Sequence, residues 1–510
     1  MQSAPDSLVE YGLRRWLIVV GVMSATLLQV LDATIVNVAL PTIQGNLGAN
    51  FDQGAWIVIG YIIAAVIVIP LTPWLQQMFG RRQYYVAAII GFTLTSALCG
   101  FAQSLDQLIF FRILQGLCGG GLISTGQAIM RDTFPAKEIG KGQALVSLGA
   151  IVGPSLGPTL GGILTDALSW NWIFYINIIP GIIAALLVAS LLRNPEGQGK
   201  PSVDGLGLGL LATGLGSLQY VLDEGERNDW LNDPTIAFLT ALSAVALAVF
   251  VWWELRVKNP IVDLRILKNR TVAAGSLLAM TLAFSLFGGV ILAPQFQQTF
   301  LNFTATLSGE SILLRAAAIA AMTPVTLFLL MRAKWQPRVL LGVGFIIVAI
   351  ANLLNAQIIT TDSTFWTFGF VLILGGVGFG MLFVPLSVAV LNSVAGPDTQ
   401  KATSLLSLCQ QLGGSISTAM LVTLLDRRGA QHLDALAGTI THNSIAATQF
   451  LAHAPAALLA RIVGAQAATM AFADAFYFLG ALTLVLAPLS LLLRPAKPAT
   501  VAGPPIVLAD

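Results

Sequence analysis

The chain carries very little charge for its length. Only 10% of its 510 residues are charged, whereas 56% are hydrophobic and the mean hydropathy is +0.81. A soluble globular domain usually carries about 25% charged residues. The scarcity of charge therefore argues against a soluble protein, and the formal net charge of +2 indicates no charged partner. We predict a polytopic membrane protein.

Cysteine and histidine are also scarce. The three cysteines lie in or beside apolar segments, have no CxxC spacing and are odd in number, so no disulfide or metal framework is expected. The three histidines fall in one predicted outer connection: His432, His442 and His453. A Rossmann glycine fingerprint, a phosphate loop and HExxH are missing. The first apolar segment is too long for a cleavable signal peptide and lacks a small-residue cleavage site, so none is expected.

Long apolar runs take up most of the chain. A membrane-spanning helix needs about 20 mostly apolar residues, and the sequence predicts fourteen such spans. They are 16–40, 54–73, 83–102, 107–130, 140–165, 172–192, 205–223, 234–255, 272–294, 309–331, 339–356, 365–391, 403–425 and 472–493. The connection at 426–471 is Ala-rich, and we expect short surface helices there instead of a separate domain.

Lys and Arg predict the orientation of the spans. With the N-terminus inside, most of these residues fall in inner connections and tails. The outer connections hold only Arg227, Arg427, Arg428 and Arg461. This partition predicts an even number of helices, with both termini in the cytoplasm.

One carboxylate, Asp32, lies in the middle of the first apolar run, in LLQVLDATIVNVALP (27–41). A carboxylate at membrane depth is costly and indicates a proton, ion or substrate role. The alternative is a hydrated position at the membrane interface. On a helix, Asp32 belongs to a stripe of small or polar residues that suits a cavity wall. The stripe consists of Ala25, Gln29, Asp32, Val36 and Ala39.

Arg112, in LIFFRILQGLCGGG, is the natural counter-charge of Asp32. At a rise of 1.5 Å per residue, Asp32 lies about 24 Å along the first span and Arg112 roughly 8 Å below the outer face. Both therefore lie in the outer half of a core about 30 Å thick. Gln115 and Gly116 follow on the face of Arg112, and we expect them to line a cavity together with Gln29. The alternative is that Arg112 snorkels to the outer surface.

GPSLGPTLGG (153–162) is the most specific pattern in the chain. Glycines every four residues form a flat stripe for close helix contact, and prolines in phase with them remove backbone donors and bend the helix. We interpret the pattern as a hinge or seal between moving halves, against the alternative of ordinary tight packing. The residues concerned are Gly153, Pro154, Gly157, Pro158, Gly161 and Gly162.

Other charged residues have simpler explanations. In PWLQQMFGRR (73–82), Gly80 marks a tight turn, and positive-inside anchoring accounts for Arg81 and Arg82. Arg315 lies near the outer end of its span, where snorkelling is the expected behaviour and a contact with a substrate anion is the alternative. Asp474, in the last span, is a second candidate for carrying a proton.

Together these residues resemble the major facilitator superfamily, in particular its fourteen-helix drug:proton antiporter branch of the EmrB/QacA type. LDATIVNVALP is similar to the first-helix motif of the branch, RILQG to its fourth-helix motif, and GxxxGPxxGG to its antiporter motif. SWNWIFYINIIPG (169–181), residues 203–230, NPIVDLRIL (259–267) and QQLGGSI (410–416) also resemble the branch. The long outer connection is similar to that of the EmrB subgroup.

The resemblance implies an all-α integral membrane fold. Two pseudo-symmetric six-helix bundles, 16–192 and 256–493, would be joined by two extra transmembrane helices at 205–255. A tail at 1–15, a linker at 193–204 and a tail at 494–510 would be cytoplasmic, and 426–471 would be periplasmic.

The resemblance also implies a function. The bundles would rock about a central site in a bacterial inner membrane, exporting hydrophobic or amphiphilic compounds in exchange for protons. Asp32 would couple the proton and Arg112 would tune its charge. The proton gradient would replace any cofactor, and no nucleic acid is expected. The EmrB subgroup further implies a periplasmic adaptor and an outer-membrane channel as partners.

The chain departs from the family pattern at four positions. Gln77 replaces an Asp of the loop motif and Pro73 a Gly, which bears on the inner charge contact attributed to that Asp. Arg315 stands where a proline is usual, and Gln410 where an arginine is usual, which bears on substrate range.

Three other functions remain open from the sequence. They are a solute:proton symporter for uptake, a membrane enzyme such as a lipid-modifying transferase, and a sensor that has lost transport. The enzyme would need clustered catalytic residues at an interface, which the scattered histidines do not supply.

Overall fold

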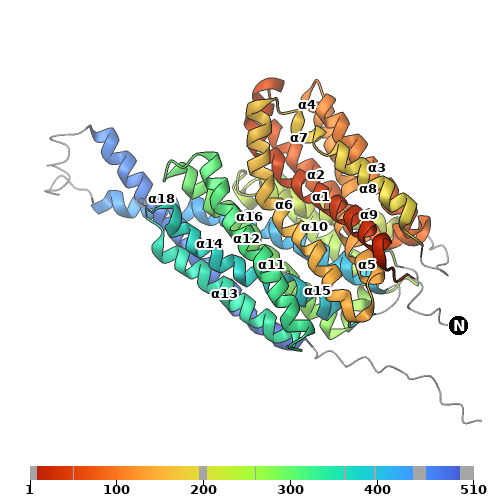
Figure 1. Ribbon diagram of the computed structural model, residues 1–510. Helices are drawn as coiled ribbons and strands as arrows, with labels where there is room; N and C mark the ends of the chain where they lie inside the picture. The colour runs from red at the N-terminus through yellow and green to blue at the C-terminus, as the bar shows by residue number, and fades with distance from the viewer. Residues whose placement is uncertain are drawn as a thin grey trace, which may run out of the picture.

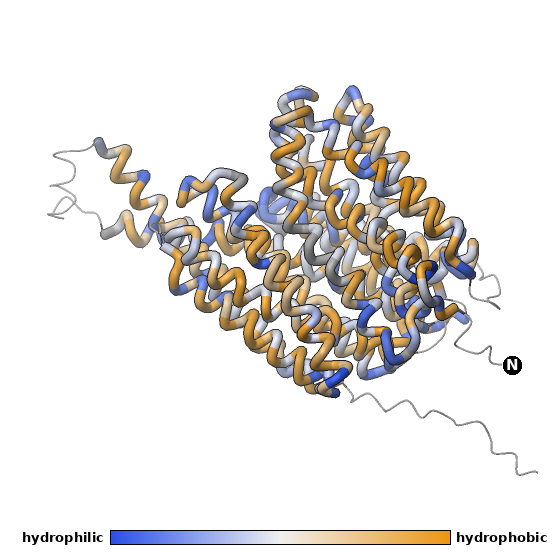
Figure 2. Tube along the Cα trace, viewed as in Figure 1, coloured by the Kyte–Doolittle hydropathy of each residue, from blue (hydrophilic) through white to orange (hydrophobic). Residues whose placement is uncertain are grey.

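The computed structural model describes residues 8–49, 51–194, 204–258, 260–360, 363–394, 398–439 and 455–493, and its secondary structure within these ranges is entirely helical. Thirteen helices there are long and apolar enough to cross a membrane. One more, α6 (Ile139–Ala167), has 29 residues. Apolar residues cover the helices along their length, and polar residues gather at their ends (Figure 2). The predicted fourteen-span membrane fold is confirmed.

The first six spans form one bundle. They are α1 (Gly12–Leu47), α2 (Phe51–Phe79), α3 (Arg81–Phe101), α4 (Leu105–Gly119) with α5 (Leu122–Thr133), α6, and α7 (Trp172–Tyr175) with α8 (Ile178–Leu191). Helix α1 packs against α6 and α8, and α4 packs against α2 and α3. Two apolar clusters, one around Phe92 and one around Phe174, lie wholly within this bundle.

The last six spans form a second bundle with the same plan. They are α11 (Arg270–Thr299), α12 (Ala305–Met331), α13 (Pro337–Ile358), α14 (Phe365–Gly380) with α15 (Phe383–Leu391), α16 (Asp398–Thr439), and α18 (Ala456–Leu486) with η4 (Ala487–Leu492). The fourth span of each bundle is broken by a two-residue turn, at 120–121 in the first bundle and at 381–382 in the second. In the first bundle this turn approaches α2 so closely that a Cβ on Gly120 would lie 2.6 Å from the backbone oxygen of Ala65.

The two additional helices, α9 (Gly205–Glu224) and α10 (Pro234–Glu254), pack against each other beside both bundles. Helix α9 contacts α2 of the first bundle and α16 of the second. An apolar cluster holds this contact together, with Val66 from α2, Leu211 and Leu215 from α9, and Phe250 from α10. The short helices η1 (Ala136–Glu138), η2 (Trp230–Asn232) and η3 (Leu264–Lys268) lie in connections.

We call the end of the molecule where α1 begins the proximal end, and the opposite one the distal end. At the proximal end α5 and α6 lie beside α15 and α16 (Figure 1). Away from it, the ends of α4 and α7 diverge from those of α14 and α18 (Figure 1). The Arg131 guanidinium donates across the bundles to Thr399 Oγ1 at 2.6 Å and to the Val394 oxygen at 2.7 Å. The bundles are thus held together at the proximal end.

The prediction of a connection at 426–471 made of short surface helices is wrong at both ends. Helix α16 continues unbroken to Thr439, and α18 already begins at Ala456; residues 440–454 lie outside the described residues. Residues 427–438 contain no proline, and most of them are exposed. Because Ala-rich sequence favours helix, α16 continues beyond the length that a membrane requires. His432 therefore lies on a helix.

Candidate functional site

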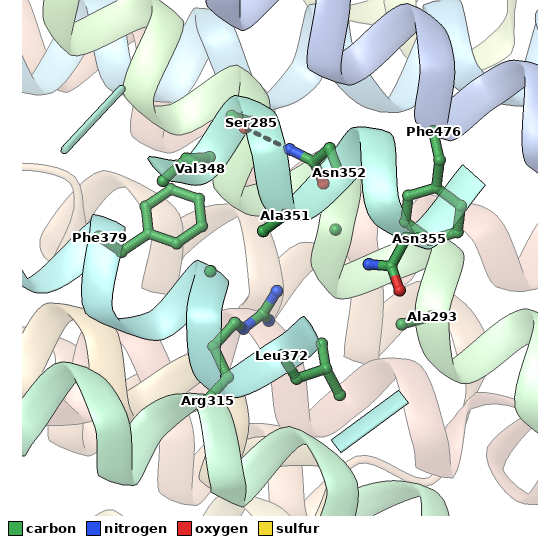
Figure 3. A pocket seen from close by; sticks show the side chains of 12 residues that line it. Ser285, Ala293, Arg315, Val348, Ala351, Asn352, Asn355, Leu372, Phe379 and Phe476 are labelled. Atoms are coloured by element: carbon green, nitrogen blue, oxygen red, sulfur yellow. Dashed lines mark hydrogen bonds between the residues drawn. The ribbon is translucent and has the colours of Figure 1, made fainter. Parts of the chain in front are cut away.

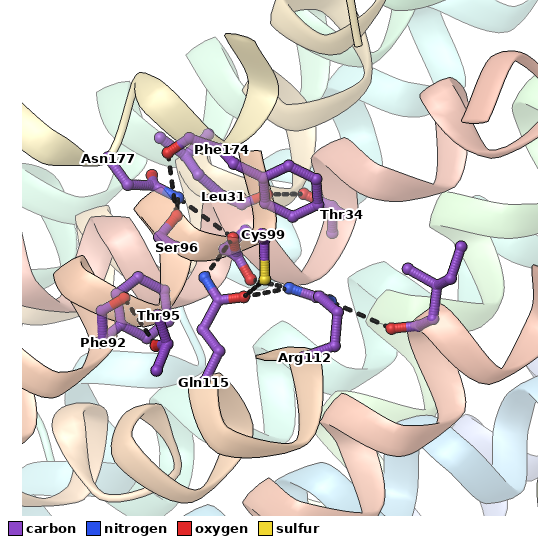
Figure 4. A network of polar contacts seen from close by, with 12 residues as sticks. Leu31, Thr34, Phe92, Thr95, Ser96, Cys99, Arg112, Gln115, Phe174 and Asn177 are labelled. Atoms are coloured by element: carbon purple, nitrogen blue, oxygen red, sulfur yellow. Dashed lines mark hydrogen bonds and ion pairs between the residues drawn. The ribbon is translucent and has the colours of Figure 1, made fainter. Parts of the chain in front are cut away.

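Asp32 and Arg112 meet inside the first bundle. Arg112 Nη1 lies 2.5 Å from Asp32 Oδ2, and both side chains are completely buried (Figure 4). The other carboxylate oxygen, Oδ1, accepts from Gln115 Nε2 at 2.9 Å and from Asn177 Nδ2 at 3.1 Å. A hydrated interfacial Asp32 and a snorkelling Arg112 are both contradicted. Since every polar neighbour of Asp32 donates, the arrangement is the one that an ionised carboxylate requires.

Arg112 is fixed by further contacts from α2 and from its own helix. Its Nε donates to the Ile57 oxygen at 3.0 Å, and its Nη1 also donates to Gln115 Oε1 at 2.8 Å. The guanidinium carbon lies 4.2 Å from the centre of the Tyr61 ring, a favourable cation–π arrangement. Only Nη2 lacks a hydrogen-bond partner within the described ranges. A buried pair remains stable when such additional bonds offset its desolvation.

Sequence reasoning did not identify Asn177. It lies where α7 ends and α8 begins, and it joins Asp32 to Ser96 Oγ, which accepts from its amide at 3.0 Å. The Ser96 hydroxyl donates in turn to the Phe174 oxygen at 2.9 Å. The sequence feature that could have identified Asn177 is its uncharged polar side chain within the apolar run WIFYINIIPG.

Two residues predicted to line a cavity beside Asp32 do something else. Gln29 Oε1 accepts the backbone N–H of Ile123 at 3.1 Å, at the start of α5, and no bond joins Gln29 to Asp32. Gly116 is a contact point between helices, because a Cβ there would lie 2.3 Å from the Tyr61 backbone oxygen. Of the three, only Gln115 touches the carboxylate.

The glycine stripe of α6 packs against α1. A Cβ would lie 2.6 Å from Val30 Cγ1 at Gly153, 2.0 Å from Thr34 Oγ1 at Gly157 and 2.8 Å from the Ile35 oxygen at Gly161, whereas at Gly162 the nearest atom is 4.0 Å away. The stripe therefore lies inside the first bundle, not between the bundles as we expected. Helix α6 itself also contacts α12 of the second bundle. The side chains of Pro154 and Pro158 lie outside the described residues.

The loop between α2 and α3 does more than anchor the protein. Arg81 is buried and its Nη1 lies 2.6 Å from Asp132 Oδ2. Asp132 Oδ1 lies 3.6 Å from Arg131, the residue that reaches the second bundle. Arg82 donates to the Ala189 oxygen, and among the described residues its side chain makes no contact with the second bundle that resembles that of Arg131. Gly80 has a φ of +89°, which glycine adopts without strain. Anchoring alone therefore does not account for Arg81.

Arg315 does not snorkel. Its side chain is 4% exposed and lines a cavity inside the second bundle, together with residues of α11, α13, α14 and α18 (Figure 3). No described side chain forms a hydrogen bond or an ion pair with its guanidinium. Asp474, by contrast, is a third exposed at the distal end and lies 2.9 Å from His432 and 3.5 Å from Arg428.

A carboxylate outside the spans is tuned by a neighbouring charge. Asp263 caps η3 and accepts from Lys401 Nζ at 2.9 Å. Partial burial acts to raise the pKa of Asp263, but the hydrogen bond and charge of Lys401 outweigh it, so the pKa lies below its usual value. This contact holds the connection before α11 against the start of α16.

The part of the chain that the structure describes contains no cluster of three or more metal-ligating side chains. The site is instead a buried ion pair within a membrane bundle, which can store charge and exchange a proton if the pair opens.

Comparisons with known proteins show the family to which the chain belongs. The chain is 35% identical over 426 residues to the multidrug export protein EmrB of Escherichia coli K12, covering 82% of both proteins. It is 34% identical over 443 residues to the fatty acid resistance protein FarB of Neisseria gonorrhoeae, covering 84% of both. The fold is similar to that of the human organic anion transporter MFSD10, with a TM-score of 0.59, 15% identity, and coverage of 92% of this chain and 99% of that one. The family model of the Major Facilitator Superfamily matches residues 22–418, and the chain belongs to this family.

Proposed function

We propose that this protein is a proton-coupled exporter of hydrophobic or amphiphilic compounds, a secondary active transporter and not an enzyme. The observation that carries the proposal is the fully buried Asp32–Arg112 pair within the first bundle. A carboxylate so costly to place in a membrane is retained where it carries ions or protons. The names of the relatives, multidrug export and fatty acid resistance, support an amphiphilic substrate.

In this proposal the proton and the substrate move through one alternating-access cycle. Asp32 holds its charge while Arg112 faces it, and takes up a proton when rearrangement of α1 and α4 separates the two. The tight contact of α1 with the α6 glycine stripe would transmit that change to the face of α6 that meets α12. In such a cycle the contact between the bundles at the proximal end would alternate with contact at the distal end.

The membrane setting follows from the same proposal. The protein would lie in a bacterial inner membrane with its proximal end, and both termini, in the cytoplasm. The gradient of protons would drive it without a cofactor. A periplasmic adaptor and an outer-membrane channel would be its partners, and the continuation of α16 and α18 at the distal end offers them a surface.

The test is a flux assay with Asp32→Asn. A growth-inhibition panel in an efflux-deficient host first identifies a transported compound, for example a fluorescent lipophilic cation. Inverted membrane vesicles are then given this compound and a proton gradient. We expect the wild type to accumulate the compound only while the gradient lasts. Loss of a positioned proton-transfer group should lower that rate by about 100-fold or more, although Asn keeps an acceptor for Arg112 and the protein still inserts.

The matched control is Asp106→Asn, an exposed carboxylate in the first turn of α4, which should transport like the wild type. Wild-type accumulation that survives collapse of the gradient would rule out antiport. Normal transport by Asp32→Asn would move the proton site elsewhere, with Asp474 the next residue to replace.

A further inference from the structure

The second bundle buries an arginine whose charge nothing in the described chain balances. Arg315 lies ten residues into α12, about 15 Å from its distal start at a rise of 1.5 Å per residue. Only 4% of its surface is exposed, and its guanidinium points into a cavity between α11, α13 and α14 (Figure 3).

The missing partner is an anion. A guanidinium stays protonated in proteins and has five donors and no acceptor. A charge in the interior of a membrane protein is normally paired, yet Arg315 Nη2 has no hydrogen-bond partner and no carboxylate pairs with Arg315 anywhere in the described residues. The described residues therefore do not supply the ion that balances it, and a bound anion would.

Two amide side chains line the cavity together with the guanidinium of Arg315. Asn352 donates to Ser285 Oγ at 3.3 Å on one side, and on another side Asn355 has no partner for its Oδ1 among the described residues. Rotation of the Asn355 amide would present its NH₂ group to a ligand. Gly289 leaves room for the guanidinium, since a Cβ there would lie 3.1 Å from Arg315 Nη1.

The remaining walls are apolar and include Leu372, Phe379 and Phe476. They offer no second cation and no further donor for a multiply charged ion. A single negative charge with few hydrogen-bond acceptors suits such walls best.

We propose that Arg315, Asn352 and Asn355 form a binding site for a small monovalent anion, with the chemistry of chloride or of a carboxylate group. Binding itself does not depend on drug export. A carboxylate in this site could also be the head group of an amphiphilic substrate. That interpretation rests on the proposed function, and the flux assay described above tests it separately from anion binding.

The experiment follows the melting temperature of the purified full-length protein in detergent at fixed pH and ionic strength. Sodium HEPES, with a bulky anion, is replaced stepwise by sodium chloride in one arm and by sodium acetate in the other. At about ten times the dissociation constant we expect the wild type to gain roughly 2 °C. Arg315→Gln should gain nothing and should melt no lower than the wild type in HEPES, because it loses an unbalanced charge.

Two further variants make the outcome decisive. Arg332→Gln, at the exposed end of the same helix, should respond like the wild type. Gly289→Ala crowds the guanidinium without removing its charge. This variant should therefore need a higher anion concentration than the wild type for the same rise in melting temperature. If Arg315→Gln does not fold, the response of Gly289→Ala tests whether the anion binds at Arg315.

Stabilisation by chloride, acetate or both that is lost in Arg315→Gln supports the site and identifies its anion. No response of the wild type to either anion overturns it. An equal response in Arg315→Gln, or a lower melting temperature of this variant in HEPES, also overturns it, because Arg315 would then have a partner within the protein.

Discussion

Arg112 and Arg315 are both buried in the distal half of their bundle, although Arg112 lies on the fourth span of the first bundle and Arg315 on the second span of the other. Groups from the first, second, fourth and sixth spans surround Arg112, and Arg315 lines its cavity together with side chains from the first, third, fourth and sixth spans. Around Arg112 these spans supply a carboxylate, two amides and an aromatic ring. Around Arg315 they supply amides and apolar walls, but no carboxylate among the described residues.

The difference shows that the symmetry of the two bundles extends to their helices but not to their charges. The Asp32–Arg112 pair carries no net charge, and protonation of Asp32 would offset the cost of separating the two side chains. An unbalanced cation attracts an anion and holds it. One bundle would then handle the proton and the other an anion, and the tests below ask whether the two arginines really differ in this way.

The strongest test compares the stability of Arg112→Gln with that of Arg315→Gln. Removing Arg112 leaves Asp32 as a buried, unpaired charge, and breaking such a pair costs about 3–5 kcal/mol. Removing Arg315 deletes a charge that no described residue balances, so the effect should be neutral or stabilising. Thermal and denaturant unfolding in detergent measure both. Equal destabilisation of the two variants would show that the arginines are equivalent.

The glycine stripe next to Asp32 offers a second test of the first bundle. A Cβ at Gly157 would lie 2.0 Å from Thr34 Oγ1, so Gly157→Ala must push α1 and α6 apart at a cost of about 1–3 kcal/mol. Gly162→Ala is the control, because its nearest neighbour is 4.0 Å away. Melting temperatures should separate the two variants, and proton-driven transport should fall only for Gly157→Ala. If Gly157→Ala and Gly162→Ala transport equally well, the glycine stripe has no part in coupling proton uptake to transport.

Contact between the two bundles is tested by Arg131→Gln. Loss of its hydrogen bonds to Thr399 and Val394 should weaken the proximal contact by about 1.4 kcal/mol, roughly tenfold in the population held together there. Distances between spin labels on the two distal ends report this shift. Arg82→Gln, which removes the hydrogen bond of this side chain to Ala189 within the first bundle, should leave the distances unchanged.

Sequence alone predicted the Asp32–Arg112 contact because helices have a fixed rise, so that depth along each span could be calculated. The calculated depth of Arg315 led to the wrong prediction that it snorkels to the outer surface. Depth along a span does not tell which side of the helix faces lipid and which faces the bundle interior. Asn177 escaped notice because an uncharged residue adds little to a hydropathy pattern and lies at a helix break. The length of α16 was underestimated, since apolar patterning ends where the membrane ends but helix propensity does not.

The smallest effect is expected for a pair outside the membrane, Asp263 and Lys401. Both side chains are about a quarter to a third exposed, so their contact should contribute less than about 1 kcal/mol, unlike the fully buried pair of Asp32. Because the pKa of Asp263 is lowered in the folded protein, its contribution is fully present above the unfolded pKa of about 4 and is lost as pH falls through the folded pKa. The melting temperature of Asp263→Asn should therefore lie slightly below that of the wild type at pH 6 and approach it near pH 3. A difference that stays constant with pH would mean that Asp263 acts through the cap it provides to η3, and not through the charge of Lys401.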